Sequence, residues 1–279
     1  MFGKMLPPLN DVVFWMLASE EYKDDFLVPF LLCALRIPEE EYDHIEFCDP
    51  RTPIEKIDEK RGIVDVLLHT RSGIIIHIEV QLKLYSWMCE RVVFYHAKNL
   101  SGQLLRGDDY KEIRKTVTIL IVGFDLKKDE LGYFCRYLYC NPETGVIFTD
   151  ISEIITLDLT KMPTSDDNTL IWPWTKYFTS KKEEEFDMLV QNHPAMQKPV
   201  AALKTLSSDT TVRLLAEERE RWHRDIVSMS NEERAIGRSE MSAEIARTMI
   251  NDGEADEKIN RYTGLTFLEI KSLRARNGV

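Results

Sequence analysis

The sequence has few cysteines, no long apolar run and no excess of positive charge, and each of these absences excludes a class of protein. Its five cysteines are odd in number and form no CxxC pair, so neither a disulfide framework nor a zinc knuckle is indicated. The longest apolar stretch, residues 117–124, is far too short to span a bilayer, and the first residues carry no signal-like run. We therefore expect a cytoplasmic protein with no membrane partner.

Periodic patterns in the N-terminal part follow the order helix, strand, strand, helix, strand, strand, which indicates a mixed α/β domain. Asn10 is placed to cap a helix that runs through Leu17, and a second helix is expected between Phe26 and Leu35. Strands are expected over residues 63–69, 74–82, 116–124, 133–140 and 145–149. A long helix is expected over residues 85–105, with an apolar stripe made of Trp87, Phe94, Ala97, Leu100, Leu104 and Leu105.

The pattern changes near residue 162, and everything beyond it is typical of helices. We therefore expect one domain over residues 1–162 and a helical C-terminal region over residues 163–279. A seam of residues spaced three and four apart begins after Asp209 and comprises Val212, Leu215, Arg219, Trp222, Ile226 and Met229. The seam suits either ordinary packing or a homodimer formed through the C-terminal helices.

Two capping boxes are expected further on, Ser230 with Glu233 and Thr266 with Glu269, each at the start of a new helix. A turn at Gly264 precedes the second box, so the chain ends in a helix, a turn and a helix. Four cations accompany this segment: Arg261, Lys271, Arg274 and Arg276. The segment suits either a DNA-binding helix-turn-helix or a packing hairpin.

Two neighbouring strands carry unusual polar residues. The segment IIIHIEVQLK, residues 74–83, alternates between an apolar side and a side that carries His77, Glu79, Gln81 and Lys83. Such a polar ladder is either exposed to solvent or the floor of a site. The preceding segment, IVDVLL, is apolar on both faces apart from Asp65, as in a central strand that is covered on both sides. A buried carboxylate must be paired, bind a cation or stay protonated.

The loop between these strands predicts which residues face each other. Arg71-Ser72-Gly73 suits a three-residue hairpin with Gly73 at positive φ, and that register places Asp65 directly across from Glu79. Two carboxylates with Cβ atoms roughly 5 Å apart repel by roughly 3–4 kcal/mol at an effective dielectric near 20. We therefore expect a cation between them. Oxygen ligands favour Mg²⁺, with Mn²⁺ as the alternative, and such an ion can activate water for phosphodiester hydrolysis.

The net charge of −11 argues against a surface that binds nucleic acid everywhere, but residues 83–115 carry a local positive surplus. The cations there are Lys83, Arg91, Lys98, Arg106, Lys111, Arg114 and Lys115, against Glu90, Asp108, Asp109 and Glu112. Gln81 can position a phosphate or a water but has no charge, so Lys83, Arg91 or Lys98 is expected to supply it. Arg91, Tyr95 and Lys98 suit either a solvated helix face or a DNA-binding track.

Asp65 in GIVDVLL, followed by Glu79 and Gln81 in IIIHIEVQL, resembles the PD-(D/E)XK nuclease signature, with Gln in place of the usual Lys. The ordered series NDVVFWML, KRGIVDVLL, IEVQL, FYHAKNLSGQLLRGDDY, TVTILIVGF and YLYCNPETGVIFTD resembles the PD-(D/E)XK nuclease-family transposases, which include the recombination-promoting nucleases. The resemblance implies a restriction-endonuclease-like αβββαβ core, with a central mixed sheet flanked by helices. It also implies a divalent metal held by Asp65, Glu79 and the backbone carbonyl of Val80, and cleavage of DNA linked to transposition or recombination.

Near the N-terminus, Asp11 matches an early acidic position of this family, and we count it among the substrate-binding candidates. Trp15 departs from the family, which generally has Lys after DVVF. If that Lys contacts substrate in relatives, this chain lacks the contact.

Three alternatives stay open at this point. The first is a catalytically inactive nuclease fold that binds DNA or a protein partner, and the second is a homo-oligomeric scaffold driven by the C-terminal helices. The third is a His/Glu metal site of another kind at His77, although no second His lies at a ligand-like spacing.

Overall fold

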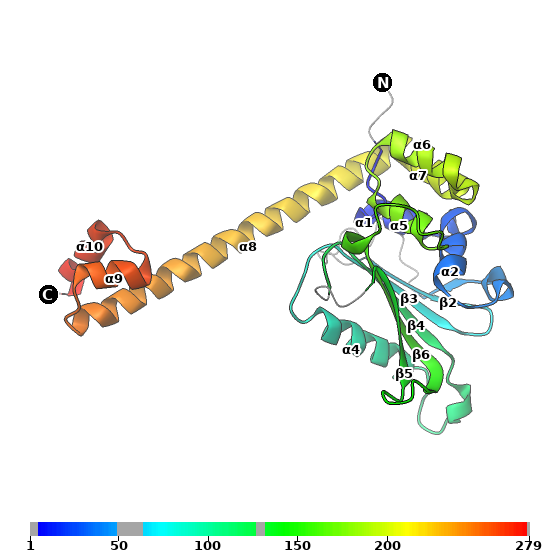
Figure 1. Cartoon of the computed structure of the whole chain (residues 1–279), viewed down its shortest axis with the longest axis horizontal. Helices are drawn as coiled ribbons and strands as arrows, with labels where there is room; N and C mark the ends of the chain where they lie inside the picture. Colours follow the sequence, from blue (N-terminus) through cyan, green and yellow to red (C-terminus); the bar gives the residue numbers. More distant parts are fainter. Residues whose placement is uncertain (1–4, 49–63, 127–131, 278–279) are drawn as a thin grey trace. The chain divides into compact units, whose positions relative to one another are not determined.

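The computed structural model describes residues 5–48, 64–126 and 132–277, and the chain divides into two compact units, Met1–Arg219 and Glu220–Val279. The first unit is built on a six-stranded sheet in the order β1-β2-β3-β4-β6-β5 (Figure 1). The strands are β1 (Glu46–Phe47), β2 (Val64–His69), β3 (Ile75–Gln81), β4 (Thr116–Val122), β5 (Phe134–Cys140) and β6 (Ile147–Asp158). Strands β3, β4 and β6 run parallel, whereas β1–β2, β2–β3 and β5–β6 pair antiparallel. This confirms the mixed α/β fold class.

The helices before the sheet follow the expected pattern. Helix α1 (Asp11–Leu17) begins at Asn10, whose side chain accepts a hydrogen bond from the backbone N–H of Val12 at 3.1 Å. The π-helix η1 (Lys23–Leu27) continues into α2 (Val28–Ala34). The short 3-10 helix η2 (Glu39–Asp43) and strand β1 had no counterpart in the sequence interpretation.

Strand β6 differs most from its prediction. A short strand was expected over residues 145–149, but β6 extends to Asp158 and lies between β4 and β5. Its middle carries Ser152 and Glu153, which lie beyond the strand expected from the sequence. Both are buried, because each has a polar partner on a distant element. The sequence therefore predicted only the start of this strand, whose buried polar residues are satisfied by tertiary contacts.

The two faces of the sheet are covered differently. One face packs against α1, α2 and the later helices, and its apolar side chains include Ile76, Ile78 and Val80 of β3. The other, which we call the α4 face, is covered by helix α4 (Met88–Ser101), whose Met88 and Val92 pack on β4 (Figure 1). Because side chains alternate along a strand, the polar ladder of β3 lies on the α4 face.

The hairpin between β2 and β3 has the expected geometry. Gly73 has φ +84°, and the N–H of Thr70 donates to the carbonyl of Ile74 at 2.9 Å. Glu41 holds the loop from outside, accepting from the Thr70 hydroxyl at 2.8 Å and the Ser72 N–H at 3.0 Å. The resulting register pairs Asp65 with Glu79, as predicted.

The helices beyond residue 162 share the core of the first unit. The first of them are α5 (Trp172–Thr179), α6 (Glu183–Asn192) and α7 (Gln197–Ser208), and the 3-10 helix η5 (Pro194–Met196) lies between α6 and α7. Tyr177, Phe186 and Leu203 are fully buried in the same cluster as Phe14 and Phe26 of the N-terminal helices. Side chains from both sides of residue 162 therefore pack in one hydrophobic core, and the domain boundary expected at residue 162 stays a prediction.

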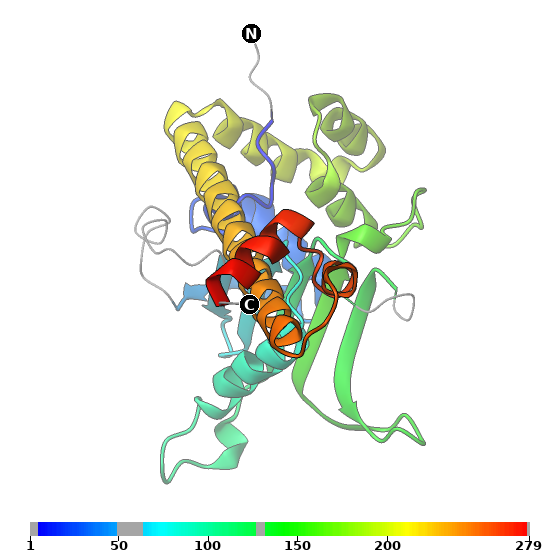
Figure 2. The ribbon, with the colours of Figure 1, turned by 90° about the vertical axis from the view of Figure 1, so that its left-hand side faces the viewer.

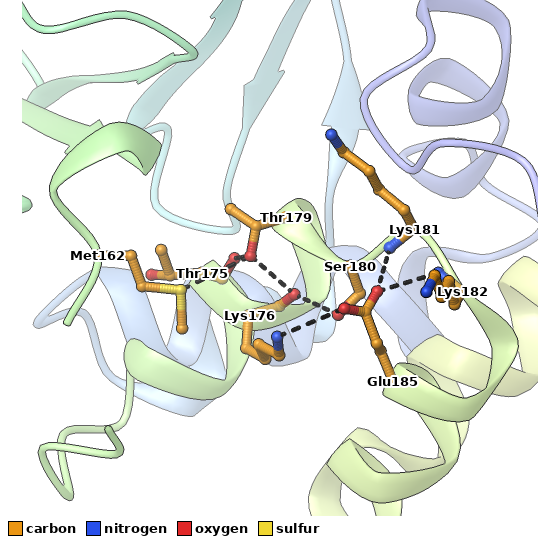
Figure 3. Close-up of polar contacts among 8 residues, drawn as sticks. All are labelled: Met162, Thr175, Lys176, Thr179, Ser180, Lys181, Lys182 and Glu185. Carbon is orange, nitrogen blue, oxygen red and sulfur yellow. Dashed lines mark hydrogen bonds and ion pairs between the residues drawn. The ribbon is translucent and has the colours of Figure 1, made fainter. Parts of the chain in front are cut away.

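Figure 3 shows how α5 joins α6. The carboxylate of Glu185 accepts hydrogen bonds from the backbone N–H groups of Lys181 at 2.7 Å and Lys182 at 3.0 Å, and its oxygen lies 4.0 Å from the Lys176 ammonium. Thr179 contacts the sulfur of Met162 at 3.6 Å, which links the segment after β6 to α5. These contacts join α5, α6 and the segment after β6. The acidic residues in the first turn of α6 are also stabilised there, because the free backbone N–H groups at a helix N-terminus favour negative charge.

The second unit contains most of α8 (Thr210–Asn251), followed by α9 (Asp256–Thr263) and α10 (Phe267–Asn277). The capping box expected at residues 230–233 is wrong, because these residues lie inside one continuous helix. The box at Thr266 is confirmed: its N–H donates to the Glu269 carboxylate at 2.7 Å. None of the helices in the described part of the chain is long and apolar enough to cross a membrane.

Helices α9 and α10 fold back on the C-terminal part of α8 (Figures 1 and 2). Ala246, Ile250, Ile259 and Ile270 form a small separate core. Arg274, one of the four cations noted in this segment, pairs with Asp256 at 2.9 Å. The segment is thus a packed helical hairpin, and this pair removes one cation from its exposed surface.

Candidate functional site

The polar ladder of β3 is buried. The exposed fraction of the side chain is 7% for His77, 1% for Glu79 and 4% for Gln81. The solvent-exposed interpretation of this face is therefore wrong, since α4 covers it. Buried polar groups require partners, so the surroundings of these three residues determine what the face can do.

Glu79 meets a guanidinium from α4. The Oε1 atom of Glu79 lies 3.5 Å from a terminal nitrogen of Arg91, whose side chain is 17% exposed. The same guanidinium lies over the ring of Tyr95, 5.4 Å from its centroid. Arg91 is one of the three residues expected to supply positive charge toward a phosphate beside Gln81; here its guanidinium lies against Glu79, and its role toward a phosphate stays a prediction.

Asp65 lies across from Glu79 in the β2–β3 register, so the two positions share the α4 face of the sheet. The side chain of Asp65 lies outside the described part of the chain. The backbone alone therefore confirms the predicted juxtaposition of the two acidic positions.

Gln81 contributes a buried oxygen. Its Nε2 donates to the backbone carbonyl of Lys83 at 3.2 Å, whereas its Oε1 is buried and accepts no hydrogen bond from the described residues. Gln81 is two residues beyond Glu79, on the same face of β3. A second oxygen donor thus lies beside the Glu79 carboxylate.

These donors fit a hard divalent cation better than a soft one. Within the described residues no group of three His, Cys, Asp or Glu side chains could hold a metal ion. The oxygen donors at this position are the Glu79 carboxylate and the Gln81 amide, with Val80 between them in β3. Magnesium is typically held by one or two carboxylates with waters and substrate phosphate completing its shell, so three protein side chains are not required.

A second histidine does lie near His77, although the sequence spacing gave no sign of it. His96 of α4 is 3% exposed, and its two ring nitrogens lie 2.8 Å from the hydroxyls of Thr118 and Ser152. Burial, and then the nearby His77, lower the pKa of His96, so the ring is neutral at pH 7. Because both ring nitrogens are engaged by hydroxyls, His96 serves to fix α4 on the sheet and does not suit a metal site.

The remaining substrate-binding candidates are spread over two elements. Tyr95, which is 41% exposed, and the exposed Lys98 lie on α4, whereas the exposed Lys83 lies in the connection after β3. Asp11 instead forms an ion pair with Arg219, with a Nε–Oδ2 distance of 2.7 Å, which ties α1 to the start of α8. The role of these residues toward a substrate stays a prediction.

Part of the basic tract is neutralised inside the fold. Lys115 lies 2.9 Å from Glu153, and Arg136 of β5 pairs with the other oxygen of the same carboxylate. Glu153 is 2% exposed, so this cluster holds β6 in the sheet rather than facing a ligand. Among the cations of this tract, Arg91 lies against Glu79, and that Lys83 and Lys98 supply charge to the site stays a prediction.

The family model described as PD-(D/E)XK nuclease family transposase matches residues 8–233, well over half of the chain. The matched range contains the whole sheet, α4 and the helices through the first part of α8. Curated proteins gave no match, and neither did solved structures.

Proposed function

The chain belongs to the PD-(D/E)XK nuclease family transposases, and from this premise we propose that it is a magnesium-dependent DNA endonuclease acting in transposition or recombination. The family supports a nuclease- or transposase-related function, with DNA as the implied substrate. The metal and the residues that perform the reaction are our proposal. Its principal support is the pairing of Asp65 with Glu79 on a face where Glu79 is 1% exposed.

We assign the metal to Asp65, Glu79 and the carbonyl of Val80. A divalent ion bound there would lower the pKa of a bound water and offset charge on the scissile phosphate. Gln81 is assigned to orient the attacking water or a phosphate oxygen, because its amide can donate without exchanging a proton. Arg91 is assigned to neutralise Glu79 in the free protein and to bind phosphate charge when DNA is present.

Plasmid nicking in Mg²⁺ tests this assignment. Asp65→Asn and Glu79→Gln should each lower the rate at least about 100-fold, since a metal supplies several kcal/mol of transition-state stabilisation. Glu143→Gln, a change of an exposed acid in the turn between β5 and β6, is the matched control and should cleave at the wild-type rate. Equal nicking by all four proteins would defeat the assignment.

A second candidate is an inactive nuclease fold that binds DNA or a protein. The Arg91–Glu79 ion pair favours it, because Glu79 already has a cationic partner. Gln81 in place of the family Lys and Trp15 in place of another Lys point the same way. Isothermal titration with Mn²⁺ separates the two candidates: binding that is lost in Asp65→Asn supports the enzyme, and its absence in wild type supports the inactive fold.

We also propose a homodimer formed through α8. Val212 of the predicted seam is buried in the first unit, but Ile226 is 41%, Met229 58% and Ile236 52% exposed. Their spacing of three and seven residues continues the heptad pattern and leaves an apolar stripe on the helix. Light scattering should give a dimer mass for wild type and a monomer mass for Ile226→Asp/Ile236→Asp. A monomeric wild type would contradict this part of the proposal.

A further inference from the structure

The outer face of α4 carries aromatic side chains that the sequence pattern assigned to packing. Trp87 is 48% and Phe94 65% exposed, whereas the helix turns Met88, Val92 and His96 toward the sheet. The predicted apolar stripe is therefore wrong. Exposed apolar residues gather on this helix and on the connection from β3: Leu82, Leu84, Tyr85, Trp87, Val93, Phe94 and Tyr95.

Aromatic and cationic residues alternate along one side of α4. Trp87, Arg91, Phe94 and Lys98 are spaced by four, three and four residues, so they follow one another on a single helical face. Over these eleven steps the helix rises about 16 Å. Since a strand of DNA carries one phosphate per about 3.4 Å along a duplex, this length matches several nucleotides.

The exposed rings contact one another in two pairs, one stacked and one edge-to-face. Tyr85 stacks on Trp87 with ring centroids 4.8 Å apart and an interplanar angle of 20°, and Phe94 meets the ring of Tyr95 edge-on at 5.4 Å. The Arg91 guanidinium lies over Tyr95 and also contacts Glu79. We call the exposed rings of Tyr85, Trp87, Phe94 and Tyr95 the aromatic face. The side chain of Arg91 joins this face to the candidate site.

We propose that this aromatic face binds unpaired bases, so that the substrate is single-stranded DNA or a locally opened duplex; the inference rests on the proposed nuclease function. Unpaired bases stack on exposed rings regardless of their sequence, and interleaved cations hold the phosphates between them. An intact duplex hides the faces of its bases and would leave Trp87 and Phe94 without a ligand. The exposed Lys98 argues against an apolar protein partner, because an apolar surface would desolvate its ammonium group without pairing it.

Fluorescence anisotropy with a labelled oligonucleotide, single-stranded or annealed to its complement, tests the proposal in EDTA, where no cleavage occurs. Trp87→Ala and Phe94→Ala should each weaken single-strand binding about 5- to 150-fold, the range that corresponds to 1–3 kcal/mol per stacked base. Duplex binding should change less than about twofold. Trp87→Phe and Phe94→Tyr keep a ring and should retain most of the affinity.

Phe148→Ala is the matched control, since Phe148 is also an exposed aromatic residue, at 87%, but lies on β6 and not on α4. Single-strand affinity that is unchanged in both alanine variants overturns the inference. A fall in self-association measured by light scattering, without a change in DNA affinity, also overturns it and identifies the face as a contact between copies.

The nicking assay separates this inference from the proposed function. Wild type that binds single strands through the rings but cleaves no DNA in Mg²⁺ supports the aromatic face as a base-binding surface and defeats the catalytic assignment. Wild type that nicks DNA, with alanine variants that bind and cleave both substrates normally, keeps the nuclease and defeats the inference.

Discussion

Replacing Arg91 with methionine should reveal whether the buried carboxylate of Glu79 depends on a cation. The change keeps most of the side-chain volume but removes the charge that lies 3.5 Å from Glu79. Breaking a buried ion pair by removing one partner typically costs 3–5 kcal/mol. Arg91 keeps 17% exposure and Glu79 has a further polar contact, so we expect a loss of about 2–3 kcal/mol in EDTA.

Magnesium should restore much of this loss if Glu79 is a metal ligand. An ion at 100 times its Kd stabilises the folded state by about 2.7 kcal/mol, provided that the unfolded chain does not bind it. The gain should be larger in Arg91→Met than in wild type, because the guanidinium no longer competes for the carboxylate. Urea unfolding followed by tryptophan fluorescence, with EDTA and with Mg²⁺, measures both quantities.

Two further variants make the experiment decisive. Arg106→Met removes an exposed arginine and should leave stability within about 0.5 kcal/mol of wild type. Arg91→Met/Glu79→Gln removes both charges and should be more stable in EDTA than Arg91→Met alone, while gaining little from Mg²⁺. Our interpretation of the site fails if Arg91→Met is as stable as wild type in EDTA, or if Mg²⁺ stabilises it no more than the double variant.

Three other predictions concern the framework of the site. Below pH about 6.5 wild type should lose stability more steeply than His96→Gln in urea unfolding, because the unfolded chain takes up a proton while burial keeps His96 neutral in the fold. Gly73→Ala should cost about 1–2 kcal/mol in thermal unfolding, since φ is +84° and the added Cβ would meet Arg114 at 3.3 Å. Asn10→Ala should cost about 1 kcal/mol in the same measurement, because it removes the cap of α1.

The β2–β3 hairpin and its register could be predicted from the sequence because the deciding information is local. Alternation fixes which residues share a face, and a three-residue loop with glycine at positive φ fixes the pairing. Asp65 therefore faces Glu79 in the structure as the sequence predicted. Residue 63, where the first of the two strands was expected to begin, lies outside the described residues.

The sequence did not predict which side of helix α4 faces the sheet. Helix α4 has apolar residues around most of its surface, and the residues that face the sheet include His96, which a hydrophobic pattern ranks as polar. What makes His96 suitable for burial is a pair of hydroxyls on β4 and β6, 22 and 56 residues away in the chain. Periodicity contains no information about partners at such separations.

Strand β6 was shortened in the prediction for the same reason. Glu153 breaks the apolar pattern, yet it is 2% exposed because Lys115 and Arg136 pair with its two oxygens. In contrast, the capping pattern at residues 230–233 failed because nothing interrupts α8 there; the residues on both sides continue the helix. A capping signature marks a helix start only where the preceding residues cannot be helical.

Two polar side chains of α4, one of them not anticipated from the sequence, connect this helix to the sheet. His96 anchors one part of the helix to β4 and β6, and Arg91, five residues earlier, reaches Glu79 on β3. A movement of α4 that kept the His96 contacts and opened Glu79 to a metal or a phosphate would carry Trp87 and Phe94 with it. Occupancy of the aromatic face and exposure of Glu79 should therefore be coupled, so that single-stranded DNA raises the apparent affinity for Mg²⁺, and by reciprocity Mg²⁺ raises the affinity for the strand.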